Sequence, residues 1–132
     1  ISAPRIAVSG LNPHAGENGM FGLEELEIIA PSIKELKIKE INVKGPFSAD
    51  SLFHEQARKN YDLVVCMYHD QALIPIKTIS FDEAVNITLG LPFVRTSPDH
   101  GTAMDIAGKG IASSSSLINS LRMAEQLSKE IV

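Results

Sequence analysis

What the sequence lacks argues against an internal disulfide, a membrane span and general nucleic-acid binding. The lone cysteine, Cys66, cannot form an internal disulfide, and its place in an apolar run is typical of a small core residue in a reducing compartment. No stretch approaches the roughly 20 apolar residues of a membrane span, and no signal-peptide pattern opens the chain. A net charge of −4 offers no basic face for nucleic acid. We therefore expect a cytoplasmic protein that binds neither nucleic acid nor membrane.

The chain has the size and composition of one folded domain. It contains 132 residues, of which 44% are hydrophobic, enough for a real core. The first residue is Ile1 rather than methionine, and the chain runs almost directly into an expected strand. We therefore expect residues 1–132 to be one portion of a longer protein.

Apolar runs alternate with helical spacings, which is the pattern of an α/β protein with a largely parallel sheet. The spacing predicts strands at Arg5–Ser9, Ile38–Val43, Asp62–Met67 (buried), Val85–Leu89 and Phe93–Arg95, helices at Leu23–Leu36, Ala49–Lys59 and Ser115–Ile131, and a turn at residues 45–50. Pro31 should kink or divide the first helix, and Ser48 is the expected N-cap of the second. Ligands of such sheets bind outside the carboxyl ends of strands, which is where His14 and His69 fall.

The first candidate group is the segment NPHAGENG, residues 12–19. It places His14 and Glu17 among small residues that let a ligand or backbone approach closely. The alternative is a polar surface loop with a solvated histidine, and the segment alone does not decide between them.

The second group is YHDQ, residues 68–71. Imidazole binds divalent metals well, and a neighbouring carboxylate such as Asp70 binds metal or fixes the tautomer of the His69 ring. The alternative is a helix start capped by Asp70, with His69 hydrogen-bonded locally. Two histidines do not complete a metal site, so a further ligand must come from elsewhere in the protein or from another chain.

Three polar residues in the second half form the third group: Lys77, Asn86 and Arg95. Arg95 leaves an apolar strand, a placement that suits bidentate binding of phosphate or carboxylate. Lys77 offers a second cation. The alternatives are solvent-facing cations paired with nearby acids, and an outward-facing strand position for Asn86.

The fourth group is DHGTAMDIAGKG, residues 99–110, where small residues and carboxylates alternate with glycines. It lacks the GxGxxG pattern of a Rossmann phosphate loop. It has groups suited to an adenosine, namely an aspartate for ribose hydroxyls and a histidine for stacking. A plain glycine-rich connection explains the segment equally well.

Together these segments resemble one family. GLNPHAGENG, MYHDQALIPIK and VNITLGLPFVRTSPDHGTAMDIAGKG, in this order and spacing, are similar to the C-terminal part of the 4-hydroxythreonine-4-phosphate dehydrogenase family of vitamin B6 synthesis. The resemblance implies a three-layer α/β fold with helices on both faces of the sheet, like that of isocitrate and isopropylmalate dehydrogenases. HGTAMDIAGKG resembles the adenosine-binding loop of those enzymes.

The resemblance also implies roles for individual residues. His14 and His69 fall on two of the three metal histidines of the family, and Lys77, Asn86 and Arg95 fall on substrate-binding positions. The expected catalytic groups are Lys77 and Asp70. The expected cofactor-binding residues are His100, Gly101, Thr102, Ala103 and Asp105. The family is a homodimer whose metal site combines residues of both subunits, which would explain why two histidines are insufficient.

The implied reaction is the NAD-dependent and divalent-metal-dependent (Zn, Mg or Co) oxidation and decarboxylation of 4-phosphooxy-L-threonine to 3-amino-2-oxopropyl phosphate. The family's third metal histidine lies upstream of Ile1, so we expect the isolated chain to be inactive. Ala72 stands where glycine is common in the family, and Ser113–Ser116 stand where an Asp-Pro pair is common. The alternatives are a paralogue acting on 4-phospho-threonate or 4-phospho-erythronate, and a non-catalytic α/β module that binds a ligand or dimerises.

Overall fold

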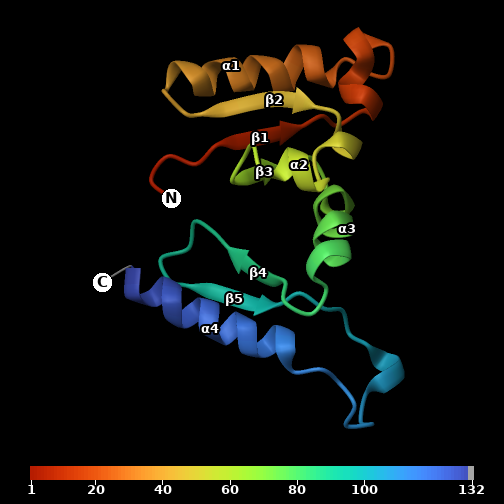
Figure 1. Cartoon of the computed structure of the whole chain (residues 1–132), viewed down its shortest axis with the longest axis vertical. Helices are drawn as coiled ribbons and strands as arrows, with labels where there is room; N and C mark the ends of the chain where they lie inside the picture. The colour runs from red at the N-terminus through yellow and green to blue at the C-terminus, as the bar shows by residue number, and fades with distance from the viewer. Residues whose placement is uncertain (131–132) are drawn as a thin grey trace. The chain divides into compact units, whose positions relative to one another are not determined.

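The chain divides into two compact units, Ile1–Pro75 (unit 1) and Ile76–Val132 (unit 2), in a computed structural model that describes residues 1–130 (Figure 1). Helix α3, His69–Ser80, begins in unit 1 and ends in unit 2. None of the helices formed by residues 1–130 combines the length and the apolar character that crossing a bilayer requires.

Unit 1 is built on a three-stranded parallel sheet. Its strands are β1 (Ile6–Ser9), β2 (Val43–Phe47) and β3 (Leu63–Val65), in the order β2-β1-β3. Both neighbours of β1 run parallel to it. The carboxyl ends of parallel strands meet at one edge of a sheet. The segments that follow the three strands therefore begin at the same edge.

A small apolar core lies between this sheet and helix α1, Ala30–Ile38. Val8, Ile29, Ile33 and Val43 are its buried members. A π-helical turn, Glu25–Ile29, leads directly into α1, and Pro31 occupies the first turn of α1. Proline is tolerated there because its missing N–H has no intrahelical partner at that point. Of the two alternatives expected at Pro31, a kink or two abutting helices, the structure has the second.

The expected strand at Ile38–Val43 is wrong, because α1 continues through Ile38 and β2 begins only at Val43. The helix ends in a Schellman motif. The Ile41 N–H donates to the Leu36 carbonyl at 3.1 Å, and Glu40 adopts a left-handed φ of 62°. Glycine usually holds that position, so a glutamate there does not indicate the end of a helix.

The next expected elements are also corrected. Gly45 and Pro46 lie inside β2 rather than in a turn, and the peptide bond between them is cis. The expected helix at Ala49–Lys59 is reduced to a 3-10 turn, Ala49–Ser51, and the short helix α2, Glu55–Arg58. Ser48 precedes the 3-10 turn, but its hydroxyl donates to the Asp50 carboxylate at 2.5 Å and caps no backbone N–H.

The strand expected at Asp62–Met67 is shorter and less buried than predicted. Strand β3 covers only Leu63–Val65, and Leu63 and Val65 are 49% and 41% exposed. β3 is an outer strand of the sheet, so it is paired on one side only.

A buried carboxylate organises the loop after β1. Glu25 is 3% exposed, and its Oε1 accepts hydrogen bonds from the Leu11 and Asn12 N–H groups at 2.7 Å each. Its Oε2 accepts one from the Asn12 side-chain amide at 2.9 Å. Burial raises the pKa of Glu25, but these hydrogen bonds outweigh it, so the pKa lies below its ordinary value. Gly16 packs against the same carboxylate, with a φ of +79°.

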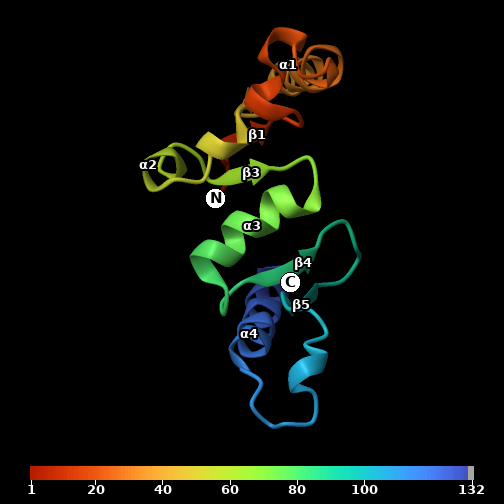
Figure 2. The same cartoon turned by 90° about the vertical axis from the view of Figure 1, so that its right-hand side faces the viewer.

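Unit 2 consists of a β-hairpin covered by a helix. Strands β4 (Val85–Thr88) and β5 (Arg95–Pro98) pair antiparallel, with Val85 opposite Pro98 and Thr88 opposite Arg95. Helix α4, Ser115–Glu130, lies along the hairpin in both views (Figure 1, Figure 2). The expected strand at Val85–Leu89 and the expected final helix are confirmed, although Ile131 lies outside the described residues. The expected strand at Phe93–Arg95 is wrong in extent, because β5 begins at Arg95.

The structure thus confirms an α/β protein with a parallel sheet, and it restricts the parallel pairing to unit 1. The Thr96 hydroxyl donates to the Ser120 carbonyl at 2.9 Å, so this side of the hairpin faces α4. Successive side chains of a strand point to opposite faces. Arg95 therefore lies on the face turned away from α4.

An ion pair at the amino ends of β1 and β3 gives a pH-dependent prediction. The Arg5 guanidinium donates to both Asp62 carboxylate oxygens, at 2.9 and 3.0 Å, and its hydrogen bonds lower the pKa of Asp62 from 3.8 to about 2. The stabilisation is therefore present above pH 3.8 and disappears as the pH falls through about 2. Asp62→Asn should destabilise unit 1 at neutral pH, and its difference from wild type should shrink towards pH 2.

Urea unfolding followed by tyrosine fluorescence measures this difference, because both tyrosines, Tyr61 and Tyr68, lie in unit 1. Glu27→Gln is the matched control, since Glu27 is an exposed carboxylate in the same unit. An Asp62→Asn effect that stays constant from neutral pH to pH 2 would contradict the role given to this pair.

The fit of Gly16 beneath Glu25 gives a second prediction. A Cβ at Gly16 would lie 2.6 Å from Glu25 Oε2, and the φ of +79° is itself unfavourable to an L-residue. Gly16→Ala should therefore lower the free energy of unfolding of unit 1 by at least about 1–2 kcal/mol. The test is the same tyrosine-detected urea titration.

Ala15→Gly is the opposite control in the same loop. Ala15 has a φ of 52°, so removing its Cβ relieves strain of about 1–2 kcal/mol, against a backbone-entropy loss of about 0.5–1 kcal/mol. This variant should be at least as stable as wild type. Equal destabilisation by both variants would contradict the prediction, because adding a Cβ at residue 16 and removing one at residue 15 would then have the same effect.

Candidate functional site

His14 lies in a left-handed stretch that follows β1. Residues 14–18 all have positive φ values, and four of the five are not glycine. Each such residue costs about 1–2 kcal/mol relative to a right-handed conformation. The His14 ring packs at a tilt against Phe21, with ring centroids 5.9 Å apart, and the residue is exposed. Surface exposure agrees with either interpretation of the segment, but five consecutive left-handed residues are more than a solvated loop requires.

A hollow of about 260 Å³ lies at the sheet edge where His14 is found. Three segments line it: residues 11–14 after β1, residues 48–50 after β2, and Tyr68 and Gln71 after β3. This is the edge at which ligands of parallel sheets bind. The position argument made from the sequence therefore holds for the His14 segment and for the segment around His69.

Asp50 belongs to this hollow, and sequence reasoning missed it. A hydrogen bond from the Ser48 hydroxyl is the main reason that the pKa of Asp50 is lowered, and the charge of His14 contributes. Its place directly after β2, a neighbour of β1, was the signal that could have found it. That signal was hidden because the strand before it was placed too early in the sequence.

His69 opens helix α3 and contacts the carboxylate beside it. Its Nδ1 lies 2.7 Å from Asp70 Oδ1, and both side chains are exposed. A ring that donates from Nδ1 carries its lone pair on Nε2, which is the form that binds a metal. The contact is the tautomer-fixing arrangement expected from the sequence, and it also matches the alternative of a locally bonded histidine. Asp70 lies in the first turn of α3, where a negative charge is favourable.

The two imidazoles and the neighbouring carboxylates have the donor chemistry of a divalent-metal site, but they do not complete one. Among residues 1–130, no three His, Cys, Asp or Glu side chains are grouped closely enough to hold a metal ion. His14 and His69 therefore fit as part of a ligand set whose remaining members lie outside this group.

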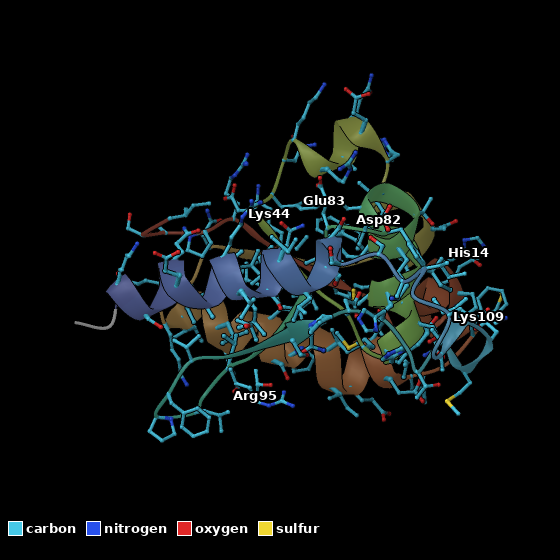
Figure 3. The ribbon with its side chains drawn as sticks, turned by 90° about the horizontal axis from the view of Figure 1, so that it is seen from below. His14, Lys44, Asp82, Glu83, Arg95 and Lys109 are labelled. Carbon is cyan, nitrogen blue, oxygen red and sulfur yellow. The ribbon has the colours of Figure 1, made fainter. Side chains whose placement is uncertain are left out.

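Unit 2 holds the three expected substrate residues. Lys77 Nζ donates to the Asp99 carbonyl at 2.5 Å and lies 3.3 Å from the Asp99 carboxylate. The paired-cation alternative thus describes Lys77 in this structure. Arg95 is exposed and donates to the Thr88 hydroxyl at 2.8 Å, and its side chain extends away from the ribbon (Figure 3).

Asn86 and Arg95 share one face of the hairpin. Asn86 lies opposite Ser97, and Thr88 lies opposite Arg95. Residues two apart on a strand, and residues directly opposite across a ladder, point to the same face. An exposed amide and a guanidinium therefore lie together on the face away from α4, which is a suitable arrangement for an anionic ligand.

The expected cofactor loop is exposed throughout. His100, Gly101, Thr102, Ala103 and Asp105 are all exposed. His100 Nδ1 lies 3.1 Å from the neighbouring Gly101 carbonyl, and Ala103 has a φ of 43°. A Cβ at Gly101 would meet nothing within 4 Å. The loop is thus accessible to a ligand.

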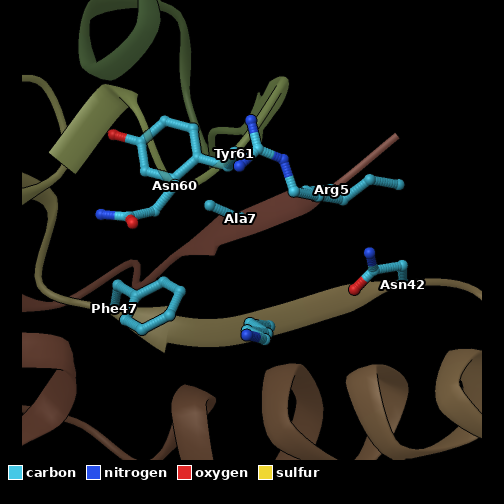
Figure 4. Close-up of a pocket in the computed structure, with 8 residues that line it drawn as sticks. Arg5, Ala7, Asn42, Phe47, Asn60 and Tyr61 are labelled. Atoms are coloured by element: carbon cyan, nitrogen blue, oxygen red, sulfur yellow. The ribbon is translucent and has the colours of Figure 1, made fainter. Parts of the chain in front are cut away.

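A second hollow in unit 1, of about 360 Å³, contains none of the expected site residues (Figure 4). Asn60 and Tyr61 lie on one side of it and Phe47 and Asn42 on the other. Ala7 lines this hollow whereas Val8 belongs to the core under α1, so the hollow lies on the face of the sheet away from α1. Burial raises the pKa of Tyr61.

The chain is similar to known proteins over nearly its whole length. The family model described as "Pyridoxal phosphate biosynthetic protein PdxA" matches residues 1–124. The 4-hydroxythreonine-4-phosphate dehydrogenase of Bradyrhizobium diazoefficiens is 65% identical over 127 residues, which are 96% of this chain and 37% of that protein. The corresponding protein of Ruegeria sp. is 60% identical and is matched over 98% of this chain and 40% of its own.

Solved structures give the same result. The 4-hydroxythreonine-4-phosphate dehydrogenase of Klebsiella pneumoniae aligns with a TM-score of 0.80 at 52% identity, over 94% of this chain and 38% of that one. A terephthalate 1,2-cis-dihydrodioldehydrogenase from Burkholderia xenovorans LB400 aligns with a TM-score of 0.71 at 34% identity, over 94% of this chain and 39% of that one. The chain spans 37–40% of the length of these relatives. With a family match over residues 1–124 and relatives up to 65% identical, the chain belongs to the PdxA family.

Proposed function

We propose that this chain is the C-terminal part of a 4-hydroxythreonine-4-phosphate dehydrogenase. The whole enzyme would oxidise and decarboxylate 4-phosphooxy-L-threonine to 3-amino-2-oxopropyl phosphate, using NAD and a divalent metal (Zn, Mg or Co). The observation that carries the proposal is the 65% identity to a protein of that name over 96% of the chain. We extend the proposal to a cytoplasmic homodimer with the three-layer fold of isocitrate and isopropylmalate dehydrogenases, in which both subunits complete the metal site.

The reaction removes a hydride and a proton from the substrate's secondary alcohol. NAD⁺ would accept the hydride, and the hydroxyl proton would pass to a base. The resulting β-keto acid would lose its carboxylate as carbon dioxide, and a proton would return to the carbon left behind. A divalent metal would supply charge stabilisation at the oxygen being oxidised.

The residues at the sheet edge of unit 1 would provide metal ligands. His14 and His69 would each give one imidazole nitrogen. Asp70, at 2.7 Å from His69 Nδ1, would orient the His69 ring and raise its basicity. Asp70 would therefore act through His69 rather than on the substrate.

The residues of unit 2 would bind the anionic groups of the substrate. Arg95 is exposed and has no carboxylate partner among residues 1–130, so its guanidinium is accessible to phosphate or carboxylate. Asn86 shares its face and would add an orienting hydrogen bond. Lys77 is already hydrogen-bonded to Asp99, and that contact would hold its ammonium in place for a charged substrate. His100, Gly101, Thr102, Ala103 and Asp105 would bind the cofactor.

A second candidate is a paralogue with another substrate, such as 4-phospho-threonate or 4-phospho-erythronate. The neighbour from Burkholderia xenovorans favours keeping it, because its name specifies a terephthalate dihydrodiol at 34% identity and a TM-score of 0.71. The fold alone therefore does not fix the substrate. Relatives named for the threonine derivative are 50–65% identical, which places the first candidate ahead.

A chimera tests the proposal, because the isolated chain covers too little of its relatives to be expected to work. This sequence should replace the matching 127 residues of the Bradyrhizobium diazoefficiens protein. The chimera should reduce NAD⁺ with 4-phosphooxy-L-threonine faster than with 4-phospho-threonate, and the 132-residue chain alone should give no NADH. The measurement is the rate of NADH formation with each substrate at equal metal concentration.

Two outcomes would contradict the proposal. A preference for 4-phospho-threonate would select the paralogue. Unchanged activity of the chimera after both His14→Ala and His69→Ala would leave the two histidines without a metal-binding role. His54→Ala is the control, because His54 accepts a hydrogen bond from the Ala57 N–H in α2 and does not line the hollow that contains His14.

A further inference from the structure

We propose that Gln71 and Glu25 are positioning residues that fix the His14 loop (residues 10–19) against the start of α3, and thereby set the separation of the His14 and His69 imidazoles. The inference rests on the proposed function, in which both imidazoles bind one metal, and it adds how the chain holds them.

Gln71 joins the two histidine-bearing segments directly. It is 7% exposed, and its Nε2 donates to the Gly10 carbonyl at 2.8 Å, across 61 residues of sequence. Its Oε1 accepts from the Met67 N–H, also at 2.8 Å. Gly10 lies four residues before His14, and Gln71 lies two residues after His69. One buried amide therefore connects the backbone that leads to one imidazole with the helix that carries the other.

The chemistry of this position favours an amide. The partner on one side is a carbonyl, which needs a donor, and the partner on the other is an N–H, which needs an acceptor. Glutamine offers both at the ends of one planar group. A carboxylate would meet the Gly10 carbonyl oxygen with a negative charge. An apolar side chain would leave the Met67 N–H without its partner and the buried Gly10 carbonyl with the Ser9 hydroxyl alone.

Glu25 holds the same loop from its other side. Its three hydrogen bonds reach the Leu11 N–H, the Asn12 N–H and the Asn12 side chain. Leu11 and Asn12 come just before the left-handed residues 14–18, whose conformation persists only where the surrounding structure fixes it. Gly16 extends the contact into that stretch, because it packs directly under the Glu25 carboxylate.

The imidazoles themselves have little else to fix them. Within residues 1–130, His14 has the ring contact with Phe21 and an electrostatic interaction with Asp50, and the His69 side chain contacts its neighbour Asp70. Both rings are exposed. Their separation is therefore determined by the backbone. Buried side chains that bond this backbone are Ser9, Glu25 and Gln71, and of these three Gln71 reaches from one histidine-bearing segment to the other.

Gln71 is therefore argued to act through the histidines rather than on the substrate, although it lines the hollow. Both ends of its amide are engaged within the chain. Loss of a partner that orients metal ligands typically weakens metal binding about ten- to hundredfold. A residue needed only for stability would lower the unfolding free energy and leave the geometry of a bound metal unchanged.

The test uses Co²⁺ and the chimera described under Proposed function, because residues 1–130 alone do not complete a metal site. Co²⁺ affinity is measured by calorimetry, and coordination geometry by the visible absorption bands of the ion. Gln71→Met has similar length and removes both hydrogen bonds, and Gln71→Glu keeps the acceptor but loses the donor. Both should bind Co²⁺ about tenfold or more weakly, with altered absorption bands and an unchanged far-ultraviolet circular dichroism spectrum. Glu25→Gln should give a smaller loss, because one oxygen still accepts from the Leu11 and Asn12 N–H groups.

Matched controls separate position from residue type. Gln126→Met changes an exposed glutamine on α4, and Glu27→Gln changes an exposed glutamate within the π-helical turn. Both should bind Co²⁺ as wild type does. Should Gln71→Met fail to fold, Gln71→Glu and Glu25→Gln carry the test, since each conserves size and one of the native acceptor roles.

The outcomes distinguish this inference from the function it rests on. The first outcome is that His14→Ala and His69→Ala abolish Co²⁺ binding, while folded Gln71 variants keep wild-type affinity and absorption bands. This outcome overturns the inference alone. Wild-type Co²⁺ binding that survives both histidine substitutions overturns the shared metal site, and this inference with it.

Discussion

Parallel pairing on both sides of β1 is the constraint on which unit 1 depends. Because β2 and β3 run in the same direction as β1, the chain must leave all three strands at one edge. Residues 10–14, 48–50 and 66–71 start there although up to 61 positions separate them. No single segment among them contains a site. His14, Asp50 and Gln71 line one hollow only because hydrogen bonding between the strands sets the starting points of their segments.

The hydrogen bonds of Glu25 explain how the strained backbone at that edge is tolerated. A left-handed stretch of five residues is unfavourable in isolation. Glu25 offsets it with bonds that an exposed carboxylate would make more weakly, since water would compete for the same donors. The buried carboxylate is stable in turn because its oxygens accept three hydrogen bonds. The loop and the π-helical turn therefore stabilise each other.

Sequence reasoning succeeded where a pattern is local and failed where a contact is distant. The periodicity of residues 115–130 and the β-run at Val85 predict α4 and β4 without further information. The end of α1 was missed because Glu40 adopts a conformation that usually indicates glycine. Glu25 was missed for a different reason: a glutamate on a helical segment resembles any surface carboxylate until its partners at Leu11 and Asn12 are known.

The same limit applies to the candidate site. His14, His69 and Asp70 were predicted as candidates because histidine and carboxylate after a strand are distinctive, and the His69–Asp70 contact follows from adjacency. Asp50 and the bridging role of Gln71 depend on strand order, which no local pattern encodes. Lys77 was identified, but its pairing with Asp99 was one of several open alternatives until the fold placed the two together.

In unit 2, the buried serines of α4 have a consequence for how the helix is held. The Ser116 hydroxyl donates to the Ala84 carbonyl and accepts from the Asp99 N–H, both at 3.1 Å, while the Ser120 carbonyl accepts from Thr96. Apolar side chains permit a helix to slide along a hairpin with modest loss, because dispersion has no direction. Hydrogen bonds do have direction, so a shift of α4 by one residue would break all three at once. The helix is therefore held in a single axial register. The hairpin that carries Asn86 and Arg95 is fixed relative to the helix by the same hydrogen bonds.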